Sequence, residues 1–456
     1  MTPNEYLEQT QEKRLADLFE FLRFPSVSAK SEHKGDVAAC GEWLKNHLNN
    51  VGFTASVYPT AGHPIVYAEY ITDPKAPTIL YYGHYDVQPA EPFDLWTTPP
   101  FEPQIRDGYI YGRGSCDDKG QTFAQIKGLE AILQAEGKLP VNVKLLIEGE
   151  EEGGGTANLS KFIRENKTML AADIVVVSDT AQFNKDLPAV TFGLRGIAFC
   201  ELYVYGPNRD LHSGTFGGAV ANPVNVLCSM IGQLHDKNGK ITIPGFYQHC
   251  KLPTKWERAQ FKKLPYKEAA YKKALGISAL HGEKGFSTYE RTWVRPTLDI
   301  NGIKGGYQGE GGKTIIPSEA SCKITMRLVP DMKPEDICNK LERHLKRIAP
   351  KSVRIKVVKH GGAKAVVVPT DGPWLEAAGR AIKTGFGKTP VFMKEGGSIP
   401  VAGDFKNSLG IDTLFVGFGQ NDDNIHSPNE RFRVIDFERG CKTAAALPFE
   451  LAKVKK

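Results

Sequence analysis

The chain of 456 residues carries a formal net charge of +6, and 24% of its residues are charged. Because the basic residues are interspersed with acids rather than gathered into one tract, we expect no nucleic-acid partner. The length exceeds that of one ordinary domain and predicts two domains, each large enough for its own core. The eight cysteines form no CxxC pair, and no window approaches a membrane span. We therefore expect reduced thiols, a cytoplasmic location and no membrane partner.

The two ends of the chain alternate between helical and strand patterns. Helices are predicted over 3–22, 37–52, 122–136, 159–166, 374–384, 399–408 and 433–452. Strands are predicted over 55–58, 65–71, 78–83, 141–148, 173–179, 390–393 and 413–418. Strands that alternate with helices and carry polar residues at their ends predict a mainly parallel α/β sheet.

The middle of the chain has a different pattern. Strands are predicted over 200–205, 297–301, 321–328 and 353–358, and helices over 223–235 and 334–348. Their order, β-α-β-β-α-β, is that of a ferredoxin-like sheet. We therefore predict an inserted domain over 193–361 and a discontinuous catalytic domain made of 1–192 and 362–456. The basic stretch 237–290 gives only one predicted helix, over 266–274.

The strand predicted over 78–83 is followed at once by His84 and Asp86. Residues two apart on an extended strand share a face, and open α/β sheets place their chemistry at this carboxyl edge. An imidazole whose other nitrogen is held by a carboxylate is a well-oriented metal ligand. Further acids and a second histidine follow later strands and turns: Asp117, Asp118, Glu150, Glu151, Glu152, Asp179 and His426.

Buried carboxylates repel one another strongly unless a cation lies among them, so this convergence predicts bound divalent metal. A donor set of His, Asp and Glu without thiolate suits zinc, manganese or cobalt. One carboxylate that bridges two ions would make a two-metal hydrolytic site.

Five motifs in a fixed order give the chain a family resemblance. They lie at 83–89, 112–120, 148–153, 178–179 and 425–430. Together they resemble the co-catalytic zinc metallopeptidase family of aminoacylases, carboxypeptidase G, succinyl-diaminopimelate desuccinylase and carnosinase-like cytosolic nonspecific dipeptidases. The resemblance runs from about residue 18 to the carboxyl terminus, and the first motif is most similar to the dipeptidase branch.

The resemblance implies two metal ions per subunit, with zinc expected and manganese or cobalt as alternatives. One ion would be held by His84, Asp117 and Asp179. The other would be held by Asp117, Glu152 and His426, so that Asp117 bridges the pair.

The resemblance also implies how the site would work. Asp86 would orient His84, and Glu151 would deprotonate the water that bridges the metals and then pass the proton to the leaving amine. Three consecutive glutamates leave Glu150 open as an alternative base, because in an extended backbone Glu150 and Glu152 would share one face.

The inserted domain resembles the family's lid, which often pairs into a homodimer. His212 would reach the partner subunit's active site and stabilise the developing oxyanion. Arg327 and His360 would bind the substrate carboxylate, a task that suits the two-pronged guanidinium. Backbone donors beside that carboxylate would come from the segment Glu395, Gly396, Gly397 and Ser398.

We therefore predict an enzyme that hydrolyses dipeptides or short peptides with free termini. The alternative is an N-acyl-amino-acid deacylase or carboxypeptidase of the same family, and an inactive binding protein is the third reading. Asp179 favours the dipeptidase, because deacylases and carboxypeptidases of this family tend to carry glutamate there. The complete set of expected ligands and base argues against an inactive protein.

Overall fold

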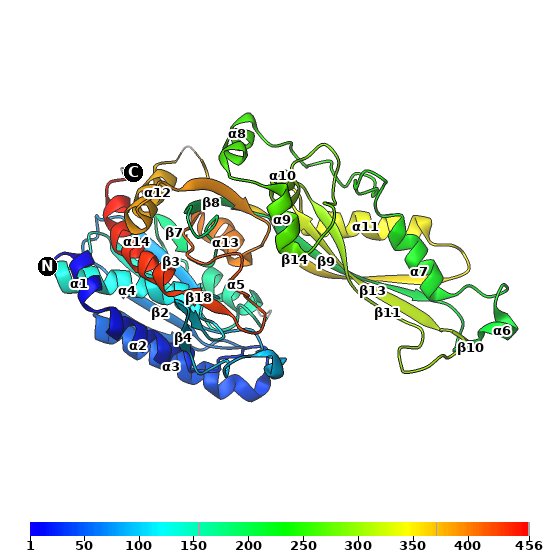
Figure 1. Cartoon of the computed structure of the whole chain (residues 1–456), viewed down its shortest axis with the longest axis horizontal. Helices are drawn as coiled ribbons and strands as arrows, with labels where there is room; N and C mark the ends of the chain where they lie inside the picture. The colour runs from blue at the N-terminus through cyan, green and yellow to red at the C-terminus, as the bar shows by residue number, and fades with distance from the viewer. Residues whose placement is uncertain (154–155, 371, 455–456) are drawn as a thin grey trace. The chain divides into compact units, whose positions relative to one another are not determined.

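The computed structural model describes residues 1–153, 156–370 and 372–454, which form two compact units (Figure 1). The first unit comprises Met1–Phe192, Val368–Met393 and Asp404–Lys456, and the second comprises Gly193–Val367 and Lys394–Gly403. The segment 193–361, predicted as an insertion, lies in the second unit together with 362–367 and 394–403. No helix among the described residues is long and apolar enough to cross a membrane.

The first unit is built on a mixed sheet whose central strands are parallel. The strand order is β1 (Thr54–Tyr58), β2 (Ile65–Tyr70), β6 (Asn142–Glu148), β3 (Thr78–His84), β7 (Ile174–Val177), β17 (Thr413–Phe415) and β8 (Ala189–Leu194). Neighbours from β6 to β17 run parallel, whereas β1, β2 and β8 pair antiparallel. Every residue of β6 is buried, including the polar Asn142, Lys144 and Glu148, as expected for a strand inside the sheet. The predicted mainly parallel α/β sheet is confirmed.

Helices cover this sheet (Figure 1). They are α1 (Pro3–Gln9), α2 (Gln11–Leu22), α3 (Lys34–Val51), α4 (Lys119–Glu136), α5 (Thr156–Glu165), α12 (Pro373–Phe386) and α14 (Val434–Ala452). Helix α4 is buried on almost all sides, and a side chain at Gly128 would collide with Ala444 of α14. Helix α3 ends where predicted, because Gly52 adopts the left-handed conformation with φ 113°.

Three helix predictions need correction. The single helix predicted over 3–22 is two helices, since Thr10 leaves helical geometry with φ −115° and ψ 17°. The helix predicted over 399–408 is α13 (Pro400–Asp404) followed by a π-helical turn, Phe405–Leu409. Besides α9 (Glu268–Leu275), the basic stretch contains α8 (Lys255–Lys263) and α10 (Thr288–Trp293), which were not predicted. Capping boxes at Thr254 and Ser287 begin these two helices and were the available signal.

The second unit contains a four-stranded antiparallel sheet. Its strand order is β11 (Thr297–Gly305), β13 (Glu319–Leu328), β9 (Gly196–Tyr205) and β14 (Arg354–Ala363). Helices α7 (Pro223–Gly232) and α11 (Pro334–Ile348) share a hydrophobic core with alternate residues of these strands. This is the predicted ferredoxin-like arrangement, and the fold class is confirmed. Strand β14 is longer than predicted, so that His360 lies on the strand rather than beyond it.

The remaining elements are short. A small three-stranded sheet consists of β4 (Gln104–Arg106), β5 (Tyr109–Tyr111) and β18 (Arg431–Arg433), with β5 in the middle. The second unit also contains β10 (Leu211–His212), α6 (Ser213–Phe216), β12 (Ile315–Ile316) and β15 (Val366–Val367). Strand β16 spans Val391–Glu395. All eight cysteines are free.

Candidate two-metal centre

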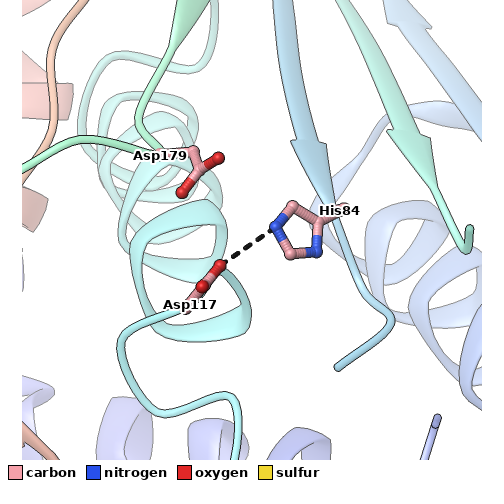
Figure 2. A group of neighbouring side chains, drawn as sticks. All are labelled: His84, Asp117 and Asp179. Carbon is pink, nitrogen blue, oxygen red and sulfur yellow. Dashed lines mark ion pairs between the residues drawn. The ribbon is translucent and has the colours of Figure 1, made fainter. Parts of the chain in front are cut away.

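Five separate segments of the first unit bring His, Asp and Glu side chains to one place. His84 is the last residue of β3, and Asp179 follows β7 by two residues. Asp117 lies in the loop before α4, and its peptide bond to Asp118 is cis. Figure 2 shows His84, Asp117 and Asp179 directed toward one another at the strand ends. This is the edge at which parallel α/β sheets place their functional groups.

The first group of candidate ligands is His84, Asp117 and Asp179, whose donor atoms all lie within 4.8 Å of one another. The Nε2 atom of His84 lies 3.2 Å from Oδ1 of Asp117. On the other side of the ring, Nδ1 lies 3.1 Å from the backbone oxygen of Asp86 and 3.5 Å from its Oδ1. The fully buried imidazole is thus oriented with Nδ1 toward Asp86 and Nε2 toward Asp117, the orientation that a metal ligand held from its other nitrogen would have.

The second group is Asp117, Glu152 and His426, again with donor atoms within 4.8 Å. The Nε2 atom of His426 lies 3.0 Å from Oδ2 of Asp117 and 3.1 Å from Oε1 of Glu152. The other carboxylate oxygen of Glu152 accepts a hydrogen bond of 2.6 Å from Gln88. Asp117 thus offers one oxygen to each group, which is what a bridging carboxylate does between two ions.

The electrostatics of these groups favour a cation. Burial raises the pKa of Asp179, and the carboxylates of Asp117 and Asp118 raise it further. Burial alone would raise the pKa of Asp117, but its contacts with His426 and His84 lower it overall. Contacts with Asp117 and Glu152 raise the pKa of His426 to about 10. The raised pKa values mean that protons on Asp179 and His426 partly neutralise the clustered carboxylates. Divalent ions could neutralise them instead.

Two buried atoms that could coordinate a metal support the fit of these residues to metal ions. Nε2 of His84 and Oε1 of Glu152 are buried and have no hydrogen-bond partner of good geometry within the described ranges. A buried polar atom without a partner costs about 1–3 kcal/mol, and coordination would remove that cost. The donor set of imidazoles and carboxylates, three per ion with one shared, is of the type that binds zinc and similar ions.

Asp86 holds more than one part of the site. It is fully buried and accepts hydrogen bonds from the Ser28 hydroxyl at 2.5 Å and from the backbone N–H groups of Glu151 and Glu152 at 3.2 and 2.9 Å. The same residue accepts from the ring of His84 through its backbone oxygen. Asp86 therefore fixes the acidic turn relative to the first histidine.

The three consecutive glutamates have different surroundings. The carboxylate of Glu150 accepts a hydrogen bond from Asn158 at 2.8 Å and lies beside Gly62. Burial raises the pKa of Glu151 to about 7, and its charged neighbours include His84. The chain turns at Glu151 and Glu152, which breaks the strand alternation that would have put Glu150 and Glu152 on one face.

Glu430 is a site residue to which the sequence reasoning assigned no role. Its fully buried carboxylate accepts hydrogen bonds of 2.9, 3.0 and 3.0 Å from the backbone N–H groups of Gly114, Cys116 and Asp117. It also pairs with the buried Arg113 at 2.9 Å. Glu430 thus anchors the loop that carries Asp117. The available signal was its place at the end of the motif that contains His426.

The predicted substrate residues belong to the second unit. Arg327 donates to the hydroxyl of Ser398 at 3.0 Å, and that hydroxyl donates to the backbone oxygen of Arg195 at 2.5 Å. Arg195 also donates to the backbone oxygen of Gly396 at 3.2 Å. Burial and the neighbouring Arg327 lower the pKa of Arg195 to about 10. Arg195 was not among the predicted site residues, although it lies in a Gly-Leu-Arg-Gly run that the sequence showed.

The other predicted residues of this unit make contacts of their own. His360 is about half exposed, and its Nε2 lies 3.6 Å from Oε1 of Glu201. His212 caps α6, where its Nδ1 accepts hydrogen bonds from the backbone N–H groups of Gly214 and Thr215. A neutral ring held in this way carries its proton on the exposed Nε2. Glu395 ends β16, with Gly397 two residues beyond.

A mainly parallel α/β unit with two groups of His and carboxylate side chains at its strand ends, together with a ferredoxin-like unit, defines the chain as a hydrolase of the metallopeptidase class. The chain belongs to Peptidase family M20/M25/M40, whose sequence profile matches residues 80–449. The predicted family resemblance and enzyme class are confirmed.

Similar proteins include dipeptidases and a carboxypeptidase. The Cys-Gly metallodipeptidase DUG1 of Candida albicans is 32% identical over 96% of this chain and 94% of its own length. The structure of human carnosine dipeptidase 1 matches with a TM-score of 0.86, at 30% identity, over 99% of this chain and 98% of that one. The M20 family metallo-carboxypeptidase Sso-CP2 of Sulfolobus solfataricus matches with a TM-score of 0.88, at 33% identity, over 96% and 99%.

Proposed function

We propose that this protein is a metal-dependent dipeptidase with two divalent ions in each subunit. The observation that carries the proposal is the pair of candidate ligand groups that share Asp117. When bound, the ions would act as Lewis acids and make an attacking water more acidic. His84 and Asp179 would hold one ion, Glu152 and His426 the other, and Asp117 both.

We assign the proton transfer to Glu151. Its carboxylate is buried and carries a pKa of about 7, so it can accept a proton from the attacking water and release it to the leaving amine near neutral pH. The hydrogen bond of Glu150 to Asn158 directs that carboxylate elsewhere and makes it the weaker alternative. Asp86 would act as a positioning residue through His84 and the backbone of Glu151.

For the substrate, we propose recognition of both charged ends. Asp179 and Glu395 would accept hydrogen bonds from a free ammonium group. Arg327, together with His360 and the backbone of Gly396–Ser398, would bind the terminal carboxylate. The contact of Arg327 with Ser398 supports this assignment, and the Arg195 guanidinium donates to the backbone oxygen of Gly396 in the same segment. A site of this kind prefers substrates short enough to satisfy both ends.

The assembly that we propose is a homodimer that pairs through the second unit, with His212 acting in the partner subunit's site. The exposed side chain of His212 and its free Nε2 proton suit a donor to a developing oxyanion. We further propose zinc as the native metal, with manganese or cobalt as alternatives, and a cytoplasmic location, which the free cysteines support.

A carboxypeptidase or N-acyl-amino-acid deacylase is the second candidate, because the matched metallo-carboxypeptidase has the same fold at 33% identity. A matched substrate series separates the two: a free dipeptide, its N-acetyl form, its C-terminal amide and an N-acyl amino acid. For a dipeptidase, we expect N-acetylation to lower kcat/KM by about a hundredfold or more, because buried acceptors would lose their charged partner. Faster cleavage of the N-acyl compounds would assign the protein to the second candidate.

Metal removal tests the chemistry itself. Exhaustive chelation followed by dialysis should abolish turnover and lower the thermal stability of the first unit, since the carboxylates would repel one another. Adding back zinc, manganese or cobalt in turn should restore both to different extents. Full activity of the metal-free protein would refute the proposal.

A further inference from the structure

The second unit contains a basic cavity of about 440 Å³. Four of its lining side chains come from α11, namely Lys340, Arg343, His344 and Arg347, and the loop after α7 adds Gly245 and Gln248. The spacing of the four residues places them on one face of the helix. The volume falls in the range of small-ligand sites.

Lys340 is held at the wall of this cavity although lysine is rarely buried. Its side chain is 7% exposed, and Nζ lies 2.7 Å from Oδ2 of Asp336 and 3.4 Å from Oε1 of Gln248. Gly245 makes room for the lysine stem, because a Cβ atom there would lie 3.3 Å from Cε of Lys340. Gly245 also has a φ of 75°, which glycine adopts without strain.

His344 is a buried residue in the wall of the cavity. The residue is 6% exposed, and its Nδ1 accepts a hydrogen bond of 2.9 Å from Arg347. Burial and the nearby Arg347 lower the pKa of His344, so the ring is neutral and its proton resides on Nε2. That Nε2 atom is buried and has no hydrogen-bond partner among residues 1–153, 156–370 and 372–454.

The charges around the cavity are unbalanced. Lys340, Arg343 and Arg347 are cationic at neutral pH, and Asp336 compensates Lys340. Arg343 forms no ion pair with an acid in the described part of the chain. The cavity thus offers several donors, two uncompensated guanidinium groups and few acceptors. Guanidinium groups match tetrahedral oxyanions through paired N–H donors.

We propose that this cavity binds an anion that carries a phosphoryl group. Lys340 and the two arginines supply the charge-assisted donors. The volume admits more than a single phosphate, so the occupant is either free phosphate or a phosphorylated small molecule. The site consists of residues of α11 and of the loop after α7, and it shares no residue with the candidate metal ligands.

Calorimetric titration of the metal-saturated protein with inorganic phosphate and with O-phosphoserine tests the proposal. We expect binding that Lys340→Met and Arg343→Met each weaken by at least about tenfold, the loss of one charge-assisted hydrogen bond. Arg343 is exposed, so its variant should fold normally even if Lys340→Met does not. Lys346→Met is the matched control, because Lys346 lies on the same helix, pairs with Glu342 and does not line the cavity.

The outcomes separate the alternatives. Tighter binding of O-phosphoserine assigns the cavity to phosphorylated small molecules, and tighter binding of phosphate assigns it to the free anion. Phosphate bound at the metal centre would survive both α11 substitutions, and equal affinity of all variants would therefore overturn the proposal. If Lys346→Met weakened phosphate binding as much as the other two substitutions, the binding would reflect unspecific attraction by a basic surface. That result would also overturn the proposal.

Discussion

The carboxylate of Glu430 accepts a hydrogen bond of 3.0 Å from the backbone N–H of Asp117, the residue shared by the two candidate ligand groups. In the described part of the chain, the hydrogen bonds to the Glu430 side chain come from Arg113 and from the backbone of Gly114, Cys116 and Asp117, so we expect it to position the loop. We expect Glu430→Gln to weaken metal affinity by about tenfold or more and to lower the free energy of unfolding by about 3 kcal/mol, because it leaves Arg113 buried and unpaired.

Metal content after dialysis and denaturant unfolding measure the two effects. Glu165→Gln is the control, because this exposed residue on α5 forms a long surface ion pair of 3.9 Å with Lys161. If Glu430→Gln kept normal metal affinity while losing stability, the residue would be purely structural. Rescue of activity by excess metal would instead support positioning of Asp117.

The assignment of the base predicts different results for adjacent glutamates. Glu151→Gln should retain metal and lower kcat by at least about a hundredfold, the usual loss for a general acid–base group. Glu150→Gln should change kcat little, because that carboxylate accepts from Asn158. Metal analysis and steady-state kinetics of both variants decide the matter. If Glu150→Gln abolished turnover and Glu151→Gln did not, our assignment would be displaced by one residue.

The sequence predicted much of the fold, because strands buried on both faces and helices with one apolar face leave clear periodic patterns. The left-handed conformation of His426, with φ 61°, leaves no such pattern, because His426 lies in the irregular loop between β17 and β18. The same limit applies to Glu150 and Glu151. The alternation of side chains between the two faces of a strand ends at a turn. The geometry of the turn directs the Glu150 carboxylate to Asn158 and removes the Glu151 carboxylate from much of its solvent.

Hydrogen bonds between residues far apart in the chain could not be predicted from the sequence either. Ser398 lies 71 residues from Arg327 and 203 from Arg195, and nothing in either local pattern indicates that one hydroxyl joins the two arginines.

The requirement for glycine at position 83 is visible only in the three-dimensional structure. A Cβ atom there would lie 1.9 Å from the Thr122 hydroxyl and 2.9 Å from the carboxylate of Asp118.

His47 should make stability depend on pH. The ring stacks on Trp43 at 5.1 Å, and burial lowers its pKa to about 4 from the ordinary 6.5. Between these values the unfolded chain binds a proton that the folded chain does not, so stability falls as pH decreases through this window. At pH 5 the loss should amount to about 2 kcal/mol or less, given partial exposure of the ring.

Denaturant unfolding at pH 7.5 and pH 5 tests this for the wild type and His47→Gln. The variant should lose less stability on acidification than the wild type does. Because metal loss at low pH would affect both proteins alike, it cancels when the two losses of stability are subtracted. The exposed His281→Gln serves as the control and should behave like the wild type. Identical pH slopes for His47→Gln and the wild type would contradict the prediction.

The proposed dimer makes a quantitative prediction about mixed subunits. Inactive Glu151→Gln and His212→Ala chains, mixed and allowed to exchange, should recover about a quarter of wild-type activity. Half of the dimers would be hybrids, and one of the two sites in each hybrid would combine an intact Glu151 with an intact His212 from the partner. Glu151→Gln mixed with Glu152→Gln is the control, because both lesions would lie in the subunit's own site and no hybrid site would be repaired. Recovery in the control as well, or full activity of a monomer in solution, would refute the shared site, whereas recovery confined to the first mixture would require His212 to act across the dimer.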